Sequence, residues 1–418
     1  MKKNLLTFLL AGTFVVSSSV ICTAETETDA SAEITSEAVT EAVVNETAAE
    51  ENTSEAISEN TAVLSEDLYS FQLKLNGELY QFPMTYTDFT ALGWEYQDDE
   101  TMEVAPNEYS PSATFQNGDL KLYASVVNLS INTLPVSECL IGGISLDQYQ
   151  IKDAPDTTIE FPGGILYGTA TLEDVKAAYG EPSNVYEGDL YTNLTYEYDY
   201  KQSVDFYIDA ETGVLNQFEI DNFAADTEAN TAAAAEVSSE PTASVLAYTA
   251  PTELGDDLTS FIVDFAGSLY QLPAPVSVFE ENGWKVKTED SDAVVAGGDF
   301  GWVTMMKDNQ ELHVIARNYD ANAAVINNCF VTSVEASKYT TNLPMTLQKG
   351  ITVGMSTADL EAALEGVDYE KEDEDGSFAY YTVTGSESSL DRVSISVNKE
   401  DDAVSTLEVS YDPKELGY

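Results

Sequence analysis

Basic side chains are scarce in this sequence of 418 residues: 17 Lys and Arg stand against 74 Asp and Glu, and the formal net charge is −57. Proteins bind phosphate groups mainly through Lys and Arg, so this balance argues against nucleic acid as a partner. The same negative charge argues against anionic membrane surfaces and anionic wall polymers as direct ligands.

Histidine is almost absent as well, since His313 is the single one. One histidine cannot build a His-rich zinc site, and no nucleophile has a base placed for Ser-His-Asp or Cys-His catalysis. His313 aligns with Tyr123 in the duplication described below, and we expect it to be a strand residue on a half-buried surface. We predict no catalytic, cofactor-binding or metal-binding residue, and therefore neither enzyme activity nor a cofactor.

Cysteine occurs three times, at Cys22, Cys139 and Cys329. The last two lie at equivalent positions of the duplication, so neither copy can hold a disulfide of its own. We predict that both are buried thiols that pack as small apolar residues. The alternative is a single bridge between them, which requires Cβ atoms about 4 Å apart.

Long hydrophobic runs are lacking, and the apolar stretch Leu5–Val16 is too short to span a bilayer. Two lysines precede it and Cys22-Thr23-Ala24 follows it, which predicts a signal peptide over residues 1–24 with cleavage after Ala24. The alternative is a lipoprotein acylated at Cys22, although Ile21 stands where that processing requires Gly, Ala or Ser. We expect a secreted, extracellular protein with no membrane span.

Two segments lack the composition of a folded domain. Residues 25–67 contain no Lys or Arg and are rich in Thr, Ser, Glu and Ala, which predicts a disordered acidic spacer. Residues 223–254 have a similar composition and predict a disordered linker. The remaining segments, 68–222 and 255–414, are each long enough to bury a core, and we call them the N-terminal region and the C-terminal region.

These two regions repeat each other. Ser70–Trp94 aligns without a gap on Ser260–Trp284, and ten of the 25 positions are identical. The offset of 190 residues holds again at two later pairs, Asn128/Asn318 and Cys139/Cys329. A period of this length predicts a tandem repeat of a whole domain, because solenoid repeats are much shorter.

The first part of each region predicts strands followed by a short helix. Apolar residues alternate up to a tight turn at Asn76-Gly77, and a helix over Tyr86–Leu92 ends at Gly93. The C-terminal region repeats this pattern with its turn at Ala266-Gly267 and its helix stop at Gly283. The recurring aromatic residues are framework positions, and we expect core packing for Tyr80, Tyr270, Trp94 and Trp284.

The second part of each region predicts one helix and an antiparallel sheet. Thr171-x-x-Asp174 and Ser356-x-x-Asp359 are capping boxes that start the helices. Gly180 ends the first helix, and alternating strands follow both. Together these patterns predict an α+β fold of two homologous domains, each with antiparallel sheets and two short helices.

The sequences GGILYGTATLEDVKAAYGEP (163–182) and KGITVGMSTADLEAALEG (349–366), with the strands after them, resemble the small SmpA/OmlA (BamE-like) repeat. The fold of the tandem β-lactamase inhibitor protein is similar to this repeat. The resemblance covers the second part of each region, and the C-terminal copy departs from it because no Pro follows Gly366. It implies scaffolding or inhibition of other proteins, and it carries over no functional residue.

These observations predict a secreted, non-catalytic binding protein with two tandem modules. Its partner is unknown, and we expect an extracellular protein or a surface component. One alternative is a structural spacer of the cell surface, and another is an acidic hydrolase that uses two carboxylates, which a sequence this rich in acids cannot single out. A calcium loop is not expected at Glu370–Gly376, because Lys371 occupies the first ligand position of the EF-hand template.

Overall fold

The fold is described from a computed structural model of the chain. It describes residues 63–340, 343–373, 376–385, 388, 390–413 and 416. The predicted signal peptide, the acylation candidate Cys22, the spacer up to residue 62 and part of the acidic loop at 370–376 lie outside the described residues.

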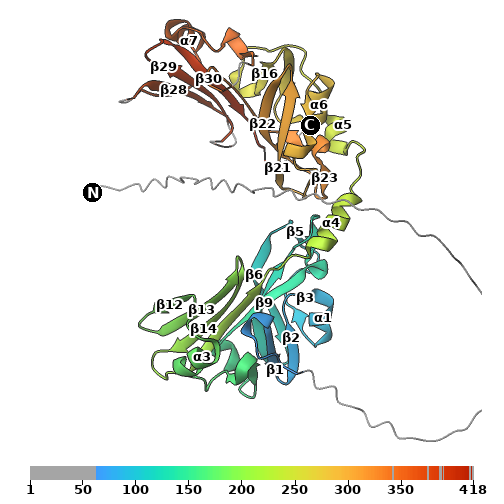
Figure 1. Ribbon diagram of the computed structural model, residues 1–418, viewed down its shortest axis with the longest axis vertical. Coiled ribbons are helices and arrows are strands. Elements are labelled where there is room, and N and C mark those ends of the chain that lie inside the picture. The colour runs from blue at the N-terminus through green and yellow to red at the C-terminus, as the bar shows by residue number, and fades with distance from the viewer. Residues whose placement is uncertain are drawn as a thin grey trace, which may run out of the picture. The chain divides into compact units, whose positions relative to one another are not determined.

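The N-terminal region is mostly β-strand (Figure 1). Its helices are α1 (Tyr86–Ala91), α2 (Gln148–Ile151) and α3 (Leu172–Tyr179). Its strands are β1 (Gln72–Leu75), β2 (Glu78–Gln81), β3 (Met84–Thr85), β4 (Glu95–Tyr96), β5 (Glu103–Val104), β6 (Tyr109–Asn117), β7 (Leu120–Val127), β8 (Leu134–Pro135), β9 (Leu140–Asp147), β10 (Ile159–Phe161), β11 (Ile165–Leu166), β12 (Asn184–Glu187), β13 (Tyr191–Asp199), β14 (Gln202–Asp209) and β15 (Leu215–Asn222).

The C-terminal region follows a similar order of elements. Its helices are α6 (Val276–Glu281) and α7 (Thr357–Ala363). Its strands are β16 (Ile262–Phe265), β17 (Ser268–Gln271), β18 (Ala274–Pro275), β19 (Lys285–Val286), β20 (Val294–Val295), β21 (Phe300–Lys307), β22 (Gln310–Arg317), β23 (Ala324–Val325), β24 (Phe330–Val331), β25 (Ser333–Ser337), β26 (Met345–Thr346), β27 (Glu370–Glu372), β28 (Phe378–Thr384), β29 (Arg392–Asn398) and β30 (Ala403–Ser410).

The sheets are antiparallel in both regions. In the N-terminal region β12-β13-β14-β15-β9-β7-β6-β4 form one long sheet, with β3 also paired to β9, and β11-β10-β1-β2 form a second sheet. In the C-terminal region the long sheet is divided into β18-β24-β22-β21-β19 and β25-β30-β29-β28-β27, beside the sheet β17-β16-β26. The division falls at Thr332, between β24 and β25, where the N-terminal region has the uninterrupted strand β9.

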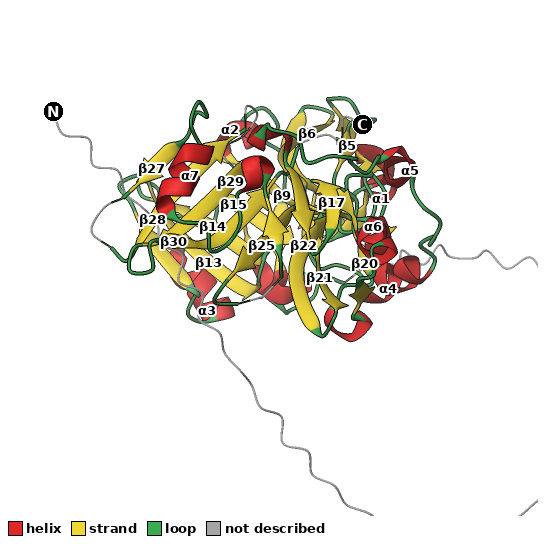
Figure 2. Cartoon of the chain, turned by 90° about the horizontal axis from the view of Figure 1, so that it is seen from above, coloured by secondary structure: helices red, strands yellow, loops and turns green. Residues whose placement is uncertain are grey.

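The strand-rich architecture confirms the expectation of antiparallel sheets with few helices, which Figure 2 shows as short red segments among the yellow strands. Helix α3 buries Val175, and α7, which lies against β30, buries Leu360. Each helix therefore covers one apolar face of a sheet, as an α+β unit requires.

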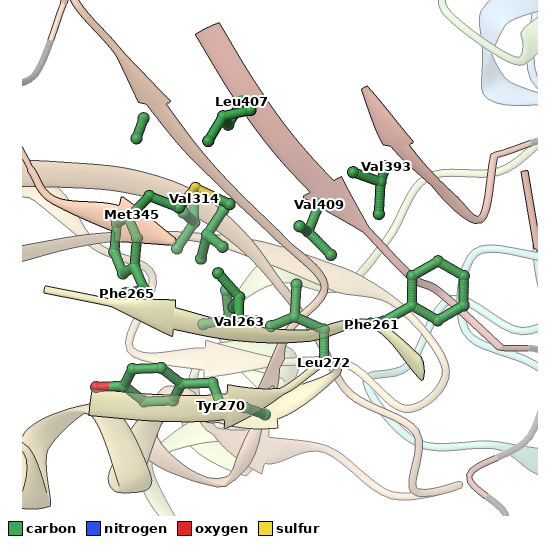
Figure 3. Packing of buried hydrophobic residues seen from close by; sticks show 14 of the residues in the cluster. Phe261, Val263, Phe265, Tyr270, Leu272, Val314, Met345, Val393, Leu407 and Val409 are labelled. Carbon is green, nitrogen blue, oxygen red and sulfur yellow. The ribbon is translucent and has the colours of Figure 1, made fainter. Parts of the chain in front are cut away.

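Each region has a hydrophobic core of its own. One core contains Tyr80, Phe89 and Trp94, and the other contains Tyr270, Phe279 and Trp284. Figure 3 shows the C-terminal core, where side chains from β16, β17, β29 and β30 meet. The predicted core role of the recurring residues is confirmed, because Tyr80, Tyr270, Trp94 and Trp284 are all at most 3% exposed.

The predicted turns and helix ends are also present. Asn76-Gly77 and Ala266-Gly267 have positive φ at both turn residues, which is the geometry of a tight two-residue hairpin. Thr171 and Asp174 form the full capping box of α3, with reciprocal hydrogen bonds of 3.3 and 2.9 Å. In α7, Ser356 accepts from Asp359 N at 3.2 Å, but the Asp359 carboxylate accepts from the Ser356 hydroxyl instead of its backbone N–H.

The segment predicted as a linker, 223–254, contains two helices, α4 (Thr227–Ala235) and α5 (Ala243–Ala247). Asp226 and Thr242 cap their first turns, and both helices are rich in Ala, the residue with the highest helix propensity. Helix caps and the helix propensity of Ala thus account for two short helices in a segment whose composition is also typical of disordered linkers.

The thiols of Cys139 and Cys329 are free and buried. Burial, with a smaller contribution from Glu138, raises the pKa of Cys139 to about 11. Burial, with a smaller contribution from Asp320, raises the pKa of Cys329 to about 12. The structure therefore contradicts a bridge between these cysteines and agrees with two packed thiols.

Candidate functional site

Several residues that recur in both regions have structural roles. Asn128 is 1% exposed and Asn318 is fully buried, and the side-chain amide of each donates to backbone carbonyls, including those of Asn132 and Asn322 respectively. His313 lies in β22 as predicted, but it is exposed to solvent, as is Tyr123 at its equivalent position in β7. Candidate binding residues must therefore be sought where the two regions differ.

One such difference lies at the start of each region, where Tyr69 of the N-terminal region corresponds to Thr259. The Tyr69 ring lies 5.2 Å from the ring of Tyr198, and Tyr198 in turn meets Phe71 edge-on at 6.3 Å. These three aromatic rings cover the end of strand β13. Large aromatic side chains thus meet at this corner of the N-terminal region, and Tyr198 remains 63% exposed there.

The C-terminal region has small residues at the corresponding places. Thr259 replaces Tyr69, and the strand register places Gly385 where Tyr198 stands. A Cβ atom on Gly385 would lie 2.8 Å from Phe261 Cζ, so the close packing of this chain segment on Phe261 requires glycine. Two cavities remain in the space around Thr259.

The larger cavity has a volume of about 580 Å³ and is an open groove. Its floor is apolar, with Leu258 and Val383 buried and Val367 and Tyr369 half-buried. The remaining residues of the lining are polar or small: Asp256, Asp257, Thr259, Lys349, Gly366, Asp368, Glu370, Thr382 and Thr384. The groove thus combines four apolar or aromatic side chains with a larger number of polar or small residues.

The smaller cavity, of about 340 Å³, shares Thr259 and Thr384 with the groove. It is further lined by Ser260, Phe261, Gln271, Asp391 and Tyr411. Asp391 is buried, and one of its carboxylate oxygens accepts from Asp412 N at 3.1 Å. Thr259 and Thr384 therefore stand between two neighbouring recesses, and the groove is the larger of the two.

The groove is held by local hydrogen bonds and by an unusual backbone conformation. Asp257 Oδ1 accepts from both the backbone N–H and the hydroxyl of Thr259, at 2.9 and 2.7 Å. Lys349 at the rim has φ 59°, where the N-terminal region has Gly163 with φ 71°. A non-glycine residue in this left-handed region costs about 1–2 kcal/mol. The exposed Lys349 is thus placed at the groove at the expense of local backbone strain.

Carboxylates gather on a second surface, the face of the long N-terminal sheet opposite its core. Asp205, Glu219 and Asp221 occupy neighbouring cross-strand positions of β14 and β15. Burial, and then the charges of Asp221 and Asp205, raise the pKa of Glu219 to about 7. Burial also raises the pKa of Asp221, against the opposing effect of a hydrogen bond from Ser125.

The arrangement of these three carboxylates does not resemble the active site of a glycosidase. Asp205 accepts hydrogen bonds from Thr195 Oγ1 at 2.5 Å and from Asn193 Nδ2 at 3.1 Å, so its carboxylate is engaged by its own sheet. Asp205, Glu219 and Asp221 lie on a sheet face and line neither of the two cavities described above. A glycosidase needs its two carboxylates on either side of a bound sugar, and this geometry does not supply that cleft.

Among the described residues, no group of three or more His, Cys, Asp or Glu side chains is placed to hold a metal ion. None of the helices formed by these residues is long and apolar enough to cross a membrane.

Comparisons with known proteins give no further guidance: no protein-family model, no curated protein and no solved structure matches the chain. The resemblance to the SmpA/OmlA (BamE-like) repeat therefore stays a prediction.

The groove residues were not singled out by the sequence. The change from Tyr69 to Thr259 is visible in the alignment at an offset of 190 residues. A Tyr-to-Thr difference alone does not reveal a cavity, because other lining residues, such as Thr384, follow more than 100 positions later and only the tertiary structure brings them close.

Proposed function

We propose that this protein is a secreted, non-catalytic binding protein and that the groove beside Thr259 takes its ligand. The observation that carries this proposal is the open groove of about 580 Å³ in the C-terminal region, lined by Thr259 where the N-terminal region has the larger Tyr69.

Homology of the two regions fits this function. Matching hairpin turns, matching helix starts and a separate core in each region support two homologous domains that arose by duplication. One copy then kept a filled corner and the other an open one. Two equal sites could add affinity through effective concentration, but the difference between Tyr69 and Thr259 argues for one ligand site in each chain.

The direct test compares the full chain with a Thr259→Tyr variant. Tyrosine at this position places in the groove the side chain that the N-terminal region already carries. Both proteins are immobilised and exposed to culture supernatant and to solubilised surface components, and the retained molecules are quantified by mass spectrometry. We expect a component that the unchanged chain and a Thr259→Ser control retain and that Thr259→Tyr loses.

Equal retention of a component by all three proteins would show that the groove beside Thr259 is not its binding site. No retained component from any fraction would contradict a binding function and favour the structural spacer. Purified Thr259→Tyr should show unchanged circular dichroism, since the groove is open to solvent and has room for the ring.

A further inference from the structure

A second surface of the C-terminal region exposes large apolar side chains, on the outer face of β21 and β22. Trp302 is 60% exposed, Phe300 is 51% exposed and Ile315 is 37% exposed. Trp302 lies directly opposite Ile315. Phe300 precedes Trp302 by two residues in the same strand and therefore lies on the same face. Neighbouring apolar side chains that remain in water mark an interaction surface more often than single ones do.

The backbone holds Trp302 firmly in place. Asp292 N donates to Trp302 O at 2.9 Å, and Asp292 Oδ2 accepts from Trp302 N at 2.7 Å. The adjacent Gly301 allows this approach, because a Cβ atom there would lie 2.6 Å from Val295 Cγ2 and 3.1 Å from Asp292 Oδ2. The exposed indole is therefore presented by an ordered strand and not by a loose loop.

This surface is specific to the C-terminal region. At the offset of 190 residues, Trp302 corresponds to Ser112 and Ile315 to Ser125. The intervening Gly301 corresponds to Pro111, and the pairing of β6 with β7 has a register irregularity between Ser110 and Ala113 that β21 and β22 lack. Proline cannot donate a ladder hydrogen bond and is found at such irregularities. Packing of the shared framework thus does not require the indole, because the N-terminal region has Ser112 at the equivalent position.

Several acidic residues lie on or beside strands β21 and β22. Asp292 bonds to its backbone, and Asp299 accepts from Phe300 N at 2.8 Å. Glu311 lies on the same face two positions before His313, whose Nε2 is 3.4 Å from the Glu311 carboxylate.

Three cations lie in this part of the region, and two of them are paired with acids, whereas the exposed Lys285 stands in the cross-strand row of Met306 and Glu311. Lys287 pairs with Asp290 and with Glu311, the latter at 3.1 Å. Arg317 pairs with Asp412 at 3.6 Å. The surface therefore keeps a negative surplus, which matches the negative charge of the whole chain.

We infer that the Trp302 surface, formed by Phe300, Trp302 and Ile315, docks a basic segment of a partner protein. A Lys or Arg side chain of that segment stacks on the indole face, and its charge is drawn by the surrounding carboxylates. Arginine suits this role best, because its planar guanidinium stacks on aromatic rings and sheds water readily. This inference does not depend on the groove beside Thr259.

The test uses the full chain and a synthetic peptide, acetyl-Arg-Gly-Arg-Gly-Arg-amide, with glutamine and leucine versions as comparisons. Trp94 and Trp284 are buried, so the long-wavelength part of the tryptophan emission reports Trp302. Labelled peptide is titrated at about 50 mM salt, where charge attraction is weakly screened. We expect a blue shift of that emission and saturable binding of the arginine peptide.

The decisive comparison is with Trp302→Ser, which introduces the residue of the N-terminal region and leaves every charge in place. We expect binding to weaken about tenfold, as loss of a cation–π contact implies. Ile315→Ser keeps the indole and should weaken binding less. Tyr380→Ser removes another exposed aromatic residue, 48% exposed on β28, and should leave binding unchanged.

Equal affinity of the unchanged chain and Trp302→Ser would overturn the inference, because binding would then follow net charge alone. Equal or tighter binding of the leucine peptide would overturn its basic character. Circular dichroism and urea denaturation of each variant confirm that the comparison is made between folded proteins.

Discussion

Asp292 satisfies both backbone groups of Trp302, through its own N–H at 2.9 Å and its carboxylate at 2.7 Å. Trp302 stands opposite Ile315 in β22, and its backbone groups point away from that strand toward Asp292. A single residue outside the strand thus continues the hydrogen-bond ladder and fixes an exposed indole.

Removal of this carboxylate should loosen the Trp302 surface. We expect Asp292→Ala to lower the free energy of unfolding by about 1 kcal/mol, the usual net contribution of one hydrogen bond. The long-wavelength tryptophan emission should lose anisotropy, because the indole then moves more freely. Asp290→Ala, which breaks an exposed ion pair with Lys287, is the control and should leave the anisotropy unchanged. The same loss in both variants would contradict a specific role of Asp292.

The filled corner of the N-terminal region should contribute to stability, whereas the open one should not. Tyr69→Thr removes a ring that contacts Tyr198 at 5.2 Å and Phe71 at 6.4 Å. We expect a loss of about 1–2 kcal/mol in the free energy of unfolding, from aromatic contacts and lost burial. Thr259→Ser, at the equivalent position, should change it by less than about 0.5 kcal/mol. Urea denaturation measures both, and a larger loss at Thr259 would contradict the difference between the two corners.

Glu219 should make stability fall as the pH rises. Burial raises its pKa from 4.5 to about 7, so between these values the folded protein holds a proton that the unfolded chain has released. Stability is then full below pH 4.5 and decreases up to about pH 7. Since Glu219 is only half-buried, we expect Glu219→Gln to recover about 1–2 kcal/mol at pH 8 and roughly half of that or less at pH 5.5.

The exposed Glu197 on β13, two strands away from β15 in the same sheet, supplies the control for this experiment. Urea denaturation at pH 5.5 and 8 should give the same pH dependence for Glu197→Gln as for the unchanged chain. An unchanged dependence in Glu219→Gln as well would show that Glu219 keeps its ordinary pKa in the folded protein.

The two buried thiols should resist alkylation until the chain unfolds. Both side chains are at most 2% exposed, and burial holds the pKa of each above the ordinary value, so little thiolate forms at pH 8. Iodoacetamide labelling followed by peptide mass spectrometry should modify Cys139 and Cys329 fully in guanidinium and only slowly in buffer. Rapid labelling of one of them in buffer would indicate that its region opens locally.

Much of the framework could be predicted from the sequence, because it rests on local chemistry. Asn76-Gly77 predicts a hairpin since these residues tolerate positive φ, and Thr171 with Asp174 predicts a helix start since both side chains reach backbone N–H groups. The recurrence of Trp94 at Trp284 identifies core positions in the same way. Helices α4 and α5 were missed because their Ala-rich composition is typical of both linkers and short helices.

The candidate sites could not be predicted from the sequence. The alignment shows Tyr69 against Thr259 and Ser112 against Trp302, but it does not say which differences lie side by side or in water. The groove is lined by residues of η4 (Leu258–Ser260) and of β27 and β28, and the two strands follow η4 by more than 100 positions. Packing of η4 against β28 brings them together.

The sequence by itself determined the alignment of the two regions, the turns, the helix starts and the recurring core residues, because each depends on neighbours within a few positions or on a second occurrence of the same pattern. The tertiary structure decided that Thr259 opens a groove, that Trp302 remains in water and that burial shifts the pKa of Glu219. The physical reason is that cavities, exposure and pKa values depend on which distant side chains pack against a residue, and packing is set by strand pairing across the whole region.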